Sequence, residues 1–261
     1  MDEQTERTTA IWLAARRWEG GSLADMPPAL KPVDEEAGYR IQAKVLTAMA
    51  GDWGPQVGWK IGVTTPQMQA YLGLNAPLAG AMPGRLRRAP GASIAHARHC
   101  RIGIECEIAM VLERPLGGGA TIGDAVAAVG MLHPAIELVD DRYGGDYAGF
   151  GVPGIVADFA FHAGFVLGSA SHYWRRLDLD AVRGVTRANG KVVGEGMGRD
   201  VMGHPMASLA WLANRLAPLG RRIEAGQIVM TGSLPLPYWA NPGDAIEVSL
   251  EGLGNVALKI D

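Results

Sequence analysis

The sequence predicts an α+β fold in which a helical N-terminal segment precedes a sheet-rich body. Within the first fifty residues, apolar side chains recur twice at the spacing of an amphipathic helix. From Gln56 onward they alternate with period two, as in strands with one buried face. The later strands and helices do not alternate regularly, so a doubly wound parallel sheet is disfavoured. We therefore expect a helical appendage over residues 1–55 and a mixed-sheet domain over residues 56–261.

Two helices are expected in the appendage. The first covers residues 11–18, and the second covers residues 41–49 and follows an N-cap at Asp34. Glycines and prolines between Gly20 and Pro32 predict an irregular connection between them.

The sheet-rich body is expected to begin with the alternating segment from Gln56 to Thr64. One clear helix interrupts the later part, because Pro205 suits a first helical turn and Gly220 can end the helix. The segment Glu251–Gly254 is expected to be a hairpin turn. Further strands are expected at Ile104–Leu112, Ala135–Val139, Phe159–Leu167, Gln227–Thr231, Ala245–Leu250 and Asn255–Ile260.

Composition and charge exclude several classes of function. The 261 residues carry a formal net charge of -3, and the short cluster of Arg85, Arg87 and Arg88 cannot follow a nucleic-acid backbone. The chain opens on acidic residues and has no apolar run long enough to cross a membrane. Cys100 and Cys106 are too few for a disulfide framework and are expected to be structural thiols. We expect a cytoplasmic protein that binds neither nucleic acid nor membrane.

Two glutamates, Glu105 and Glu107, give the strongest chemical signal. Alternation within the apolar segment Ile104–Leu112 places both side chains on one strand face, with Cα atoms about 6.6 Å apart. Semi-buried carboxylates this close repel each other unless a cation compensates. Glu137, in the apolar segment Pro134–Val139, is the candidate third ligand. Three carboxylates favour Mg²⁺ or Mn²⁺ over zinc.

A less specific interpretation of these glutamates also stands. Glu105 and Glu107 would then lie on the wet face of an antiparallel strand, and Glu137 would pair with an arginine such as Arg142. In that case the three carboxylates would bind no ion.

Lys60 is the candidate residue for charge neutralisation or proton transfer. It lies between Gly58 and Gly62 on the face opposite an apolar row, and the missing side chains would let a ligand approach its ammonium. Partial burial that lowered its pKa would favour proton transfer. The alternative is an exposed lysine on an edge strand.

A small polar segment, Thr231–Gly232–Ser233, follows an apolar strand. Its hydroxyl and N–H groups could hold a substrate carboxylate, although an ordinary turn has the same composition. His204, directly before Pro205, is interpreted as a helix-capping residue rather than a catalytic one.

An ordered set of segments resembles the 2-keto-4-pentenoate hydratases and the related 4-oxalocrotonate decarboxylases of the fumarylacetoacetate hydrolase superfamily. No single segment is specific, but their order over most of the chain is. The segments are Val57–Thr64, Ile104–Glu107, Pro134–Val139, Gly203–Pro205 with the helix containing Ala210–Ala213, Gly226–Ser233 and Pro242–Asp244.

The resemblance implies a fold and a set of site residues. The fold is a mixed-sheet half-barrel or roll with an N-terminal helical appendage, and the sheet domain is the catalytic one. Mg²⁺ or Mn²⁺ would be the cofactor, a small 2-oxo or enol acid the substrate, and a homo-oligomer active in aromatic catabolism the working form. The implied metal ligands are Glu105, Glu107 and Glu137, and the implied catalytic residue is Lys60. We also expect the substrate to contact Thr64, Thr231, Gly232 and Ser233.

The implied reaction adds water at C4 of a 2-hydroxy-2,4-dienoate to give a 4-hydroxy-2-oxo acid. Lewis-acid polarisation of the 2-oxo group stabilises the enolate on either side of this addition. The same centre would serve a 2-oxo acid decarboxylase or an acylpyruvate hydrolase, and an inactive metabolite-binding homologue is a further alternative.

Two positions depart from the pattern of the hydratases. Pro77-Leu78 stands where a Pro-Asp pair is often found, and Asp158-Phe159 stands where an Asp-Asn pair is common. The usual proton-transfer partner of Lys60 is therefore replaced. The candidate substitutes are Asp140, Asp141 and His162.

Overall fold

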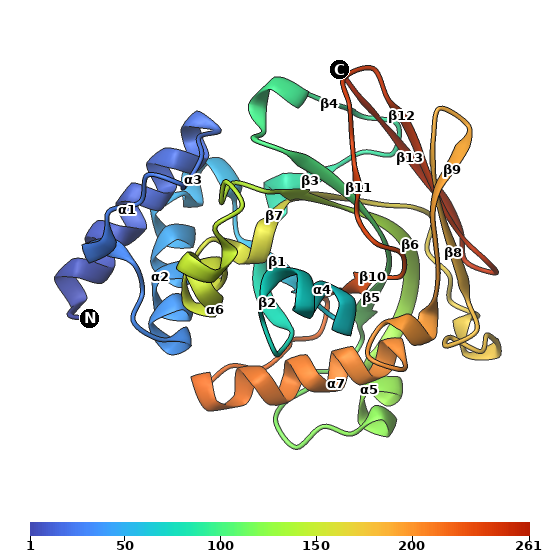
Figure 1. The fold of residues 1–261 in the computed structure, drawn as a ribbon. Coiled ribbons are helices and arrows are strands. Elements are labelled where there is room, and N and C mark those ends of the chain that lie inside the picture. Colours follow the sequence, from blue (N-terminus) through green and yellow to red (C-terminus); the bar gives the residue numbers. More distant parts are fainter.

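Two β-sheets and a group of N-terminal helices form the protein, whose computed structural model describes residues 1–261 (Figure 1). The larger sheet has the strand order β2-β1-β10-β5-β6-β7-β3, with β11 paired to β5, and the smaller has the order β4-β13-β12-β8-β9. The strands are β1 (Gln56–Gly62), β2 (Leu78–Pro83), β3 (Arg87–Arg88), β4 (Ser93–Ile94), β5 (Ile102–Leu112), β6 (Val129–Asp140), β7 (His162–Leu167), β8 (Arg183–Ala188), β9 (Lys191–Met197), β10 (Ile228–Ser233), β11 (Tyr238–Trp239), β12 (Ala245–Leu250) and β13 (Gly254–Ile260).

The helices lie at one side of the larger sheet and beneath it. In Figure 1, α1 to α3 and α6 stand on the left, while α7 and α5 run along the bottom. Helix α6 packs on α2 although a hundred residues separate them, so the helical layer draws on both parts of the chain. The helices are α1 (Glu3–Glu19), α2 (Glu35–Ala48), α3 (Ala50–Trp53), α4 (Pro66–Leu72), α5 (Ile122–Ala128), α6 (Tyr147–Ala157) and α7 (Pro205–Leu216).

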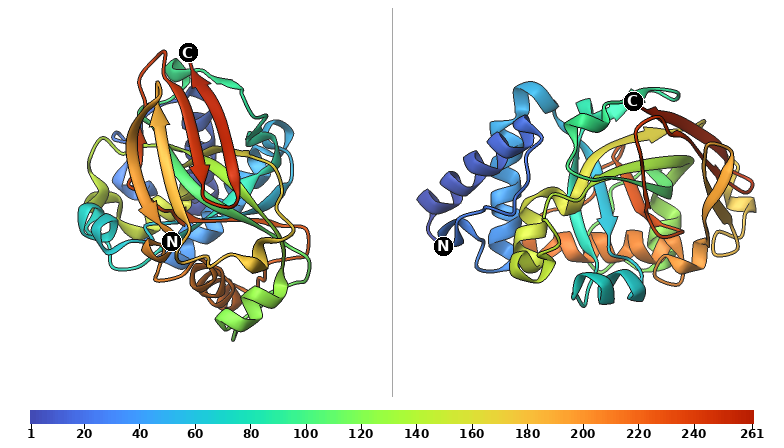
Figure 2. Two further views of the ribbon diagram at one scale, coloured as in Figure 1. Left: turned by 90° about the vertical axis from the view of Figure 1, so that its right-hand side faces the viewer. Right: turned by 45° about the horizontal axis from the view of Figure 1, so that its top comes forward.

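The larger sheet is strongly curved, and the smaller sheet lies beside it as a separate sheet (Figure 2). Strand β1 runs parallel to β10, while β10, β5, β6 and β7 are successively antiparallel, so the sheet is mixed. One apolar core joins residues of both sheets and of the helices. The predicted α+β class, with a curled mixed sheet and N-terminal helices, is confirmed.

Local sequence signals explain where several helices begin and end. Asp2 and Asp34 are N-caps that accept backbone N–H bonds from Thr5 and Ala37, and Gly20 ends α1 in the left-handed conformation. Helix α7 begins at Pro205, as predicted. The ring of His204 accepts the N–H of Met206 at 3.0 Å, which confirms its capping role.

One predicted strand is wrong at its start. Residues 159–161 do not belong to β7, because Phe159, Ala160 and Phe161 have φ values of 59°, 48° and 71°. Left-handed backbone costs an L-residue about 1–2 kcal/mol, and it cannot continue a strand. This left-handed turn, Phe159–Phe161, lies beside the site described below.

Several elements give no clear sequence signal. Strand β9 is mostly exposed and carries glycine at alternate positions, so it shows no apolar alternation. Helix α6 is interrupted at Gly151, near Pro153, which hides its period. Cys106 is buried whereas Cys100 is exposed, and both are free thiols. None of the helices combines the length and the apolar run that crossing a bilayer requires.

Candidate metal centre and active site

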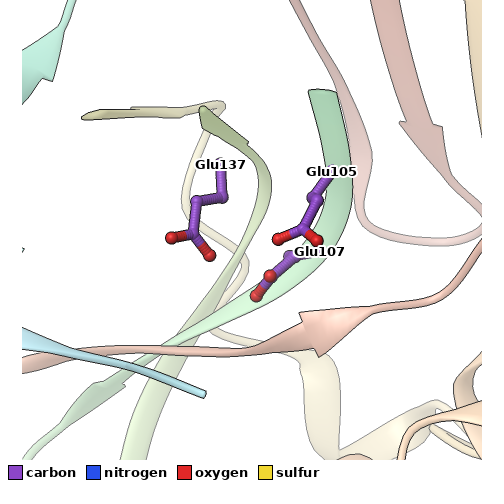
Figure 3. A group of neighbouring side chains, drawn as sticks. All are labelled: Glu105, Glu107 and Glu137. Atoms are coloured by element: carbon purple, nitrogen blue, oxygen red, sulfur yellow. The ribbon is translucent and has the colours of Figure 1, made fainter. Parts of the chain in front are cut away.

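Three glutamates from two neighbouring strands converge on one point (Figure 3). Glu105 of β5 stands directly opposite Glu137 of β6, and Glu107 follows on the same face of β5. One carboxylate oxygen from each residue lies within 4.8 Å of the other two. Glu107 and Glu137 are fully buried, so the alternative of a wet strand face is wrong.

Two of the carboxylate oxygens lack the partner that a buried acid requires. Oε1 of Glu107 and Oε2 of Glu137 have no hydrogen-bond partner. Burial, together with the neighbouring acids, raises the pKa of Glu107 well above its usual range. Burial also raises the pKa of Glu105 to about 7, against the opposing charge of Lys60. Orphaned, converging carboxylate oxygens fit a hard divalent cation.

Lys60 lies inside the sheet rather than on an edge strand. Its strand, β1, runs between β2 and β10, and its side chain is only 2% exposed. Nζ donates to the carbonyl of Ala160 at 2.9 Å and lies 3.4 Å from Oε1 of Glu137. The edge-strand alternative is therefore wrong.

The two glycines that flank Lys60 do different things. A Cβ on Gly62 would lie 2.8 Å from Nζ, so this glycine leaves room for the ammonium as expected. A Cβ on Gly58 would lie 1.9 Å from the carbonyl oxygen of Ile228, so this glycine allows β1 to approach β10. The expectation that both glycines clear the ammonium is correct only for Gly62.

The charge state of Lys60 follows from its surroundings. Burial acts to lower its pKa, but the charges of Glu137, Glu105 and Glu107 outweigh burial, so the net direction is upward. Lys60 is an ammonium at neutral pH. The expectation that burial lowers the pKa of Lys60 is therefore wrong for the metal-free site, where Lys60 holds the proton that a donor needs.

His162 is the functional neighbour that the sequence left among several candidates. Its ring is fully buried, and Nδ1 lies 2.8 Å from Oε1 of Glu137. Burial lowers the pKa of His162, so the neutral ring donates from Nδ1 to the carboxylate. Glu137 thus pairs with His162 and Lys60, whereas Arg142 forms its ion pair with Asp158, at 3.5 Å.

Asp140 and Asp141, the other candidate substitutes, are bonded to groups other than the three glutamates. Oδ1 of Asp140 accepts the backbone N–H of Arg101 at 2.9 Å. Asp141 accepts from the hydroxyl of Tyr147 at 2.6 Å and lies 3.6 Å from a guanidinium nitrogen of Arg101. Of the three candidates, only His162 contacts the carboxylate cluster.

The predicted substrate contacts fall into two groups. Thr64 and Ser233 line the cleft beside Glu105. Thr231 is fully buried and donates to the carbonyl of Ile108 at 2.8 Å, so its hydroxyl supports β10. The N–H of Gly232 donates to Oε2 of Glu107 at 2.8 Å and orients that carboxylate.

Glu105 lines two neighbouring cavities. The outer cleft has a volume of about 920 Å³ and is bounded by the segments 62–69, 195–203 and 233–237. The inner cavity, of about 30 Å³, has Lys60 on its wall and is otherwise mostly apolar. A small polar molecule in the cleft can therefore reach Glu105, and Lys60 stands on the wall of the small cavity behind it. The aromatic residues of the inner cavity are Tyr71, Tyr147, Phe161 and Trp239.

Residues 68–261 match the fumarylacetoacetate (FAA) hydrolase C-terminal family, which is about three quarters of the chain. The chain belongs to this family. It is 36% identical over 222 residues to 4-oxalocrotonate decarboxylase of Pseudomonas putida, covering 85% of this chain and 83% of that protein. It is 32% identical over 254 residues to 2-keto-4-pentenoate hydratase 1 of Dechloromonas aromatica (strain RCB), covering 97% and 95%.

A solved member of the FAA hydrolase family has the same fold throughout. The 4-oxalocrotonate decarboxylase from Pseudomonas putida G7, complexed with magnesium and adipate, superposes with a TM-score of 0.93 at 28% identity. The match covers 100% of this chain and 99% of that one. Magnesium in this neighbour agrees with a cluster of carboxylates that can bind a divalent metal ion.

The structure shows the surroundings of Leu78 and Phe159, the two residues at which this chain departs from the hydratase pattern. Leu78 is fully buried on β2, opposite Gly62 of β1, so an apolar side chain fills this position next to the strand of Lys60. Phe159 occupies a left-handed position, which asparagine tolerates better than most residues. Its ring packs edge-on against Trp53, with ring centroids 5.3 Å apart.

Proposed function

We propose that this FAA hydrolase family member is a metal-dependent lyase that hydrates a 2-hydroxy-2,4-dienoate to a 4-hydroxy-2-oxo acid. The observation that carries the proposal is the convergence of Glu105, Glu107 and Glu137 beside the buried ammonium of Lys60 and next to two neighbouring cavities. The names of the relatives support a lyase, since both hydratases and decarboxylases belong to that class.

The three glutamates are the proposed ligands of Mg²⁺ or Mn²⁺. When bound, such an ion supplies Lewis-acid polarisation of the 2-oxo group. Gly232 and His162 hold two of the ligands in place by donating to Glu107 and Glu137, and such supporting bonds set ligand geometry.

Lys60 is the proposed proton donor. Conversion of the dienol to its keto form moves a proton from the 2-hydroxyl to C5, and hydration then adds hydroxyl at C4 and a proton at C3. An ammonium facing the inner cavity can deliver a proton to carbon and take one back, while the apolar wall limits access of bulk water. Thr64 and Ser233 are the proposed contacts for the substrate's polar groups.

A decarboxylase is the second candidate, and one observation favours it. Arg199 lines the outer cleft and has no carboxylate within ion-pair distance, whereas the neighbouring Glu195 is neutralised by Arg183 at 2.7 Å. A free guanidinium suits a substrate with a second carboxylate, as in 4-oxalocrotonate. Measuring CO₂ release separates the two reactions.

Three finer proposals concern the whole chain. Residues 1–55 would act as a helical appendage of the catalytic domain 56–261, the working form would be a homo-oligomer, and the protein would be cytoplasmic. Size measurements in solution test the second of these.

The first experiment is an assay that follows the ultraviolet absorbance of 2-hydroxypenta-2,4-dienoate. Chelator-treated protein is compared with and without Mg²⁺ or Mn²⁺, alongside Lys60→Ala and the exposed-lysine control Lys191→Ala. We expect turnover to depend on the metal, to be lost in Lys60→Ala and to persist in the control. Metal binding without turnover of this substrate or of 4-oxalocrotonate would favour the inactive metabolite-binding homologue.

A further inference from the structure

Helix α1 carries one arginine, Arg17, whose side chain is buried inside the protein. Arg17, in the last turn of α1, has a side chain only 6% exposed. Its Nε donates to Oδ1 of Asp158 at 2.6 Å, Nη2 to the carbonyl of Asp158 at 2.6 Å, and Nη1 to the carbonyl of His162 at 2.8 Å. All three nitrogens of the guanidinium are therefore bonded to the two residues that bracket the turn 159–161.

The left-handed conformation of the turn 159–161 needs contacts from outside the turn. Phe159, Ala160 and Phe161 are three consecutive L-residues in the left-handed region, which local preferences oppose. The planar fork of Arg17 spans the turn from end to end, and its face lies 4.9 Å from the ring centroid of Phe159. The remaining contacts to Asp158 are longer, at 3.5 Å from Arg142 and 3.4 Å from the hydroxyl of Tyr143.

The same turn makes two contacts with the candidate active site. The carbonyl of Ala160, in the middle of the turn, accepts the bond from Nζ of Lys60. The ring of His162, directly after the turn, donates to Glu137. A shift of the turn would thus displace the ammonium and one carboxylate together. Arg17 itself lines neither the outer cleft nor the inner cavity.

We propose that Arg17 is a positioning residue of the active site, which fixes the left-handed turn and through it sets Lys60 and Glu137. Its effect on turnover rests on the proposed function, whereas its effect on the carboxylate cluster does not. Arg17 and Lys60 both precede residue 68, where the family match begins. The N-terminal helix would therefore contribute to the chemistry and not only to folding.

A matched pair of arginines on α1 allows a sharp test. Arg16 is the neighbour of Arg17, but it pairs with Asp25 and Glu19 at the surface, so Arg16→Ala is the control. Arg17→Ala removes the guanidinium, and Arg17→Lys keeps the charge but replaces the planar fork of three nitrogens by a single ammonium nitrogen. The measurements are Mn²⁺ affinity by titration calorimetry, hydrogen exchange of residues 158–164, and kcat and KM in the dienoate assay.

We expect Arg17→Ala and Arg17→Lys to weaken Mn²⁺ binding by about tenfold, as loss of a support for a metal ligand does. Hydrogen exchange of the turn should accelerate. In both variants kcat should fall about 10- to 100-fold, with KM changed far less, because the reacting groups are misplaced while the cleft is intact. Guanidinium ion added to Arg17→Ala should restore part of the Mn²⁺ affinity and of kcat, and it should not affect Arg16→Ala.

Other outcomes are equally decisive. If both Arg17 variants bind Mn²⁺ like Arg16→Ala and protect the turn as well as the wild type does, the proposal is wrong. If Arg17→Ala does not fold, the Mn²⁺ affinity and hydrogen exchange of Arg17→Lys test the proposal. Wild-type values in Arg17→Lys would contradict the positioning role and would mean that Arg17 only holds α1 against the rest of the protein. If the wild type turns over no dienoate, the proposed function fails, but Mn²⁺ affinity and hydrogen exchange still test the positioning role.

Discussion

Glu107 has the least favourable surroundings for a charged carboxylate among the three glutamates. It is fully buried, one oxygen has no partner, and two further carboxylates stand beside it. In Glu107→Gln, we expect Mn²⁺ affinity to fall by at least about tenfold, since even supporting residues of metal ligands are worth that much. The metal-free variant should melt at a higher temperature than the metal-free wild type, because the amide removes the cost of burying a carboxyl group beside two others, a cost that the raised pKa of Glu107 reflects. Calorimetry measures both effects.

The control for Glu107 is Glu113→Gln, which changes an exposed glutamate just beyond the end of the same strand. It should leave both the Mn²⁺ affinity and the melting temperature near wild type. Unchanged Mn²⁺ affinity in Glu107→Gln would contradict the metal centre.

Arg199 tests the chemistry of the substrate's far end. In Arg199→Ala, we expect KM to rise about tenfold for a substrate with a second carboxylate, which corresponds to roughly 1.4 kcal/mol of lost binding. This is less than a buried charged hydrogen bond contributes, because Arg199 is exposed. The KM of a monocarboxylate dienoate should stay the same, as should both values in the control Arg176→Ala. Equal KM changes for both substrates would refute selective recognition.

Residue-scale predictions from the sequence succeeded where a local pattern sufficed. The two-residue spacing of Glu105 and Glu107 already fixes their common strand face. His162 was harder to assign, because it meets Glu137 only through a register shift between β6 and β7, near Leu138 and Val139. Such a shift depends on contacts between distant segments, which no local pattern records.

At the scale of elements, a buried acid joins the first two helices. Glu6 of α1 accepts from Arg40 at 2.8 Å and from Lys44 at 2.9 Å, both on α2. Burial acts to raise the pKa of Glu6, but the hydrogen bonds and charges of these two cations outweigh it, and the pKa is lowered. A lowered carboxyl pKa stabilises the fold above the unfolded value, and this stability is lost as the pH falls through the folded value.

Replacing Glu6 by Gln should therefore destabilise the protein in a pH-dependent way. At pH 7 we expect the free energy of unfolding to fall by about 1–2 kcal/mol. The loss is modest because Arg40 and Lys44 are partly exposed, so water screens their charges. The difference from wild type should shrink as the pH falls below about 4.5, where the unfolded glutamate becomes protonated. Denaturant melts from pH 7 down to pH 3.5 measure it, with the exposed Glu3→Gln as control. A constant difference at every pH would rule out the charge as the cause.

A helix or strand could be predicted from the sequence where its buried side chains recur at the regular spacing of that element. Helix α7 and strand β12 were predicted with their observed bounds or nearly so, since each presents one clear apolar face. The turn 159–161 was assigned to a strand because Phe159 and Phe161 are typical strand residues. Its left-handed backbone is imposed from outside, by the carbonyl contacts of Arg17 and Lys60.

At the scale of the whole molecule, buried polar bonds join the helical layer to the sheet. Gln42 of α2 donates to the carbonyl of Val156 at 2.6 Å and accepts the N–H of Ala81 on β2 at 3.0 Å. Arg17 of α1 adds a second link by donating to the carbonyl of His162, the first residue of β7, and the core is continuous across both parts. Separating the layer from the sheet would break these bonds and expose the apolar side chains of the shared core to water.

We therefore expect the helices and the sheet to unfold in one transition. Far-UV circular dichroism and tryptophan fluorescence should give the same midpoint for the metal-free protein at a fixed concentration. Mn²⁺ at a hundred times its Kd should add about 2.7 kcal/mol of stability, which raises both midpoints together by roughly 5 to 10 °C. If residues 1–55 were an independent unit, fluorescence and dichroism would separate, and Mn²⁺ would move only the transition of the sheet. Coincident shifts would mean that a metal ion bound by β5 and β6 stabilises helix α1 as well, as a molecule joined through Arg17 and Gln42 requires.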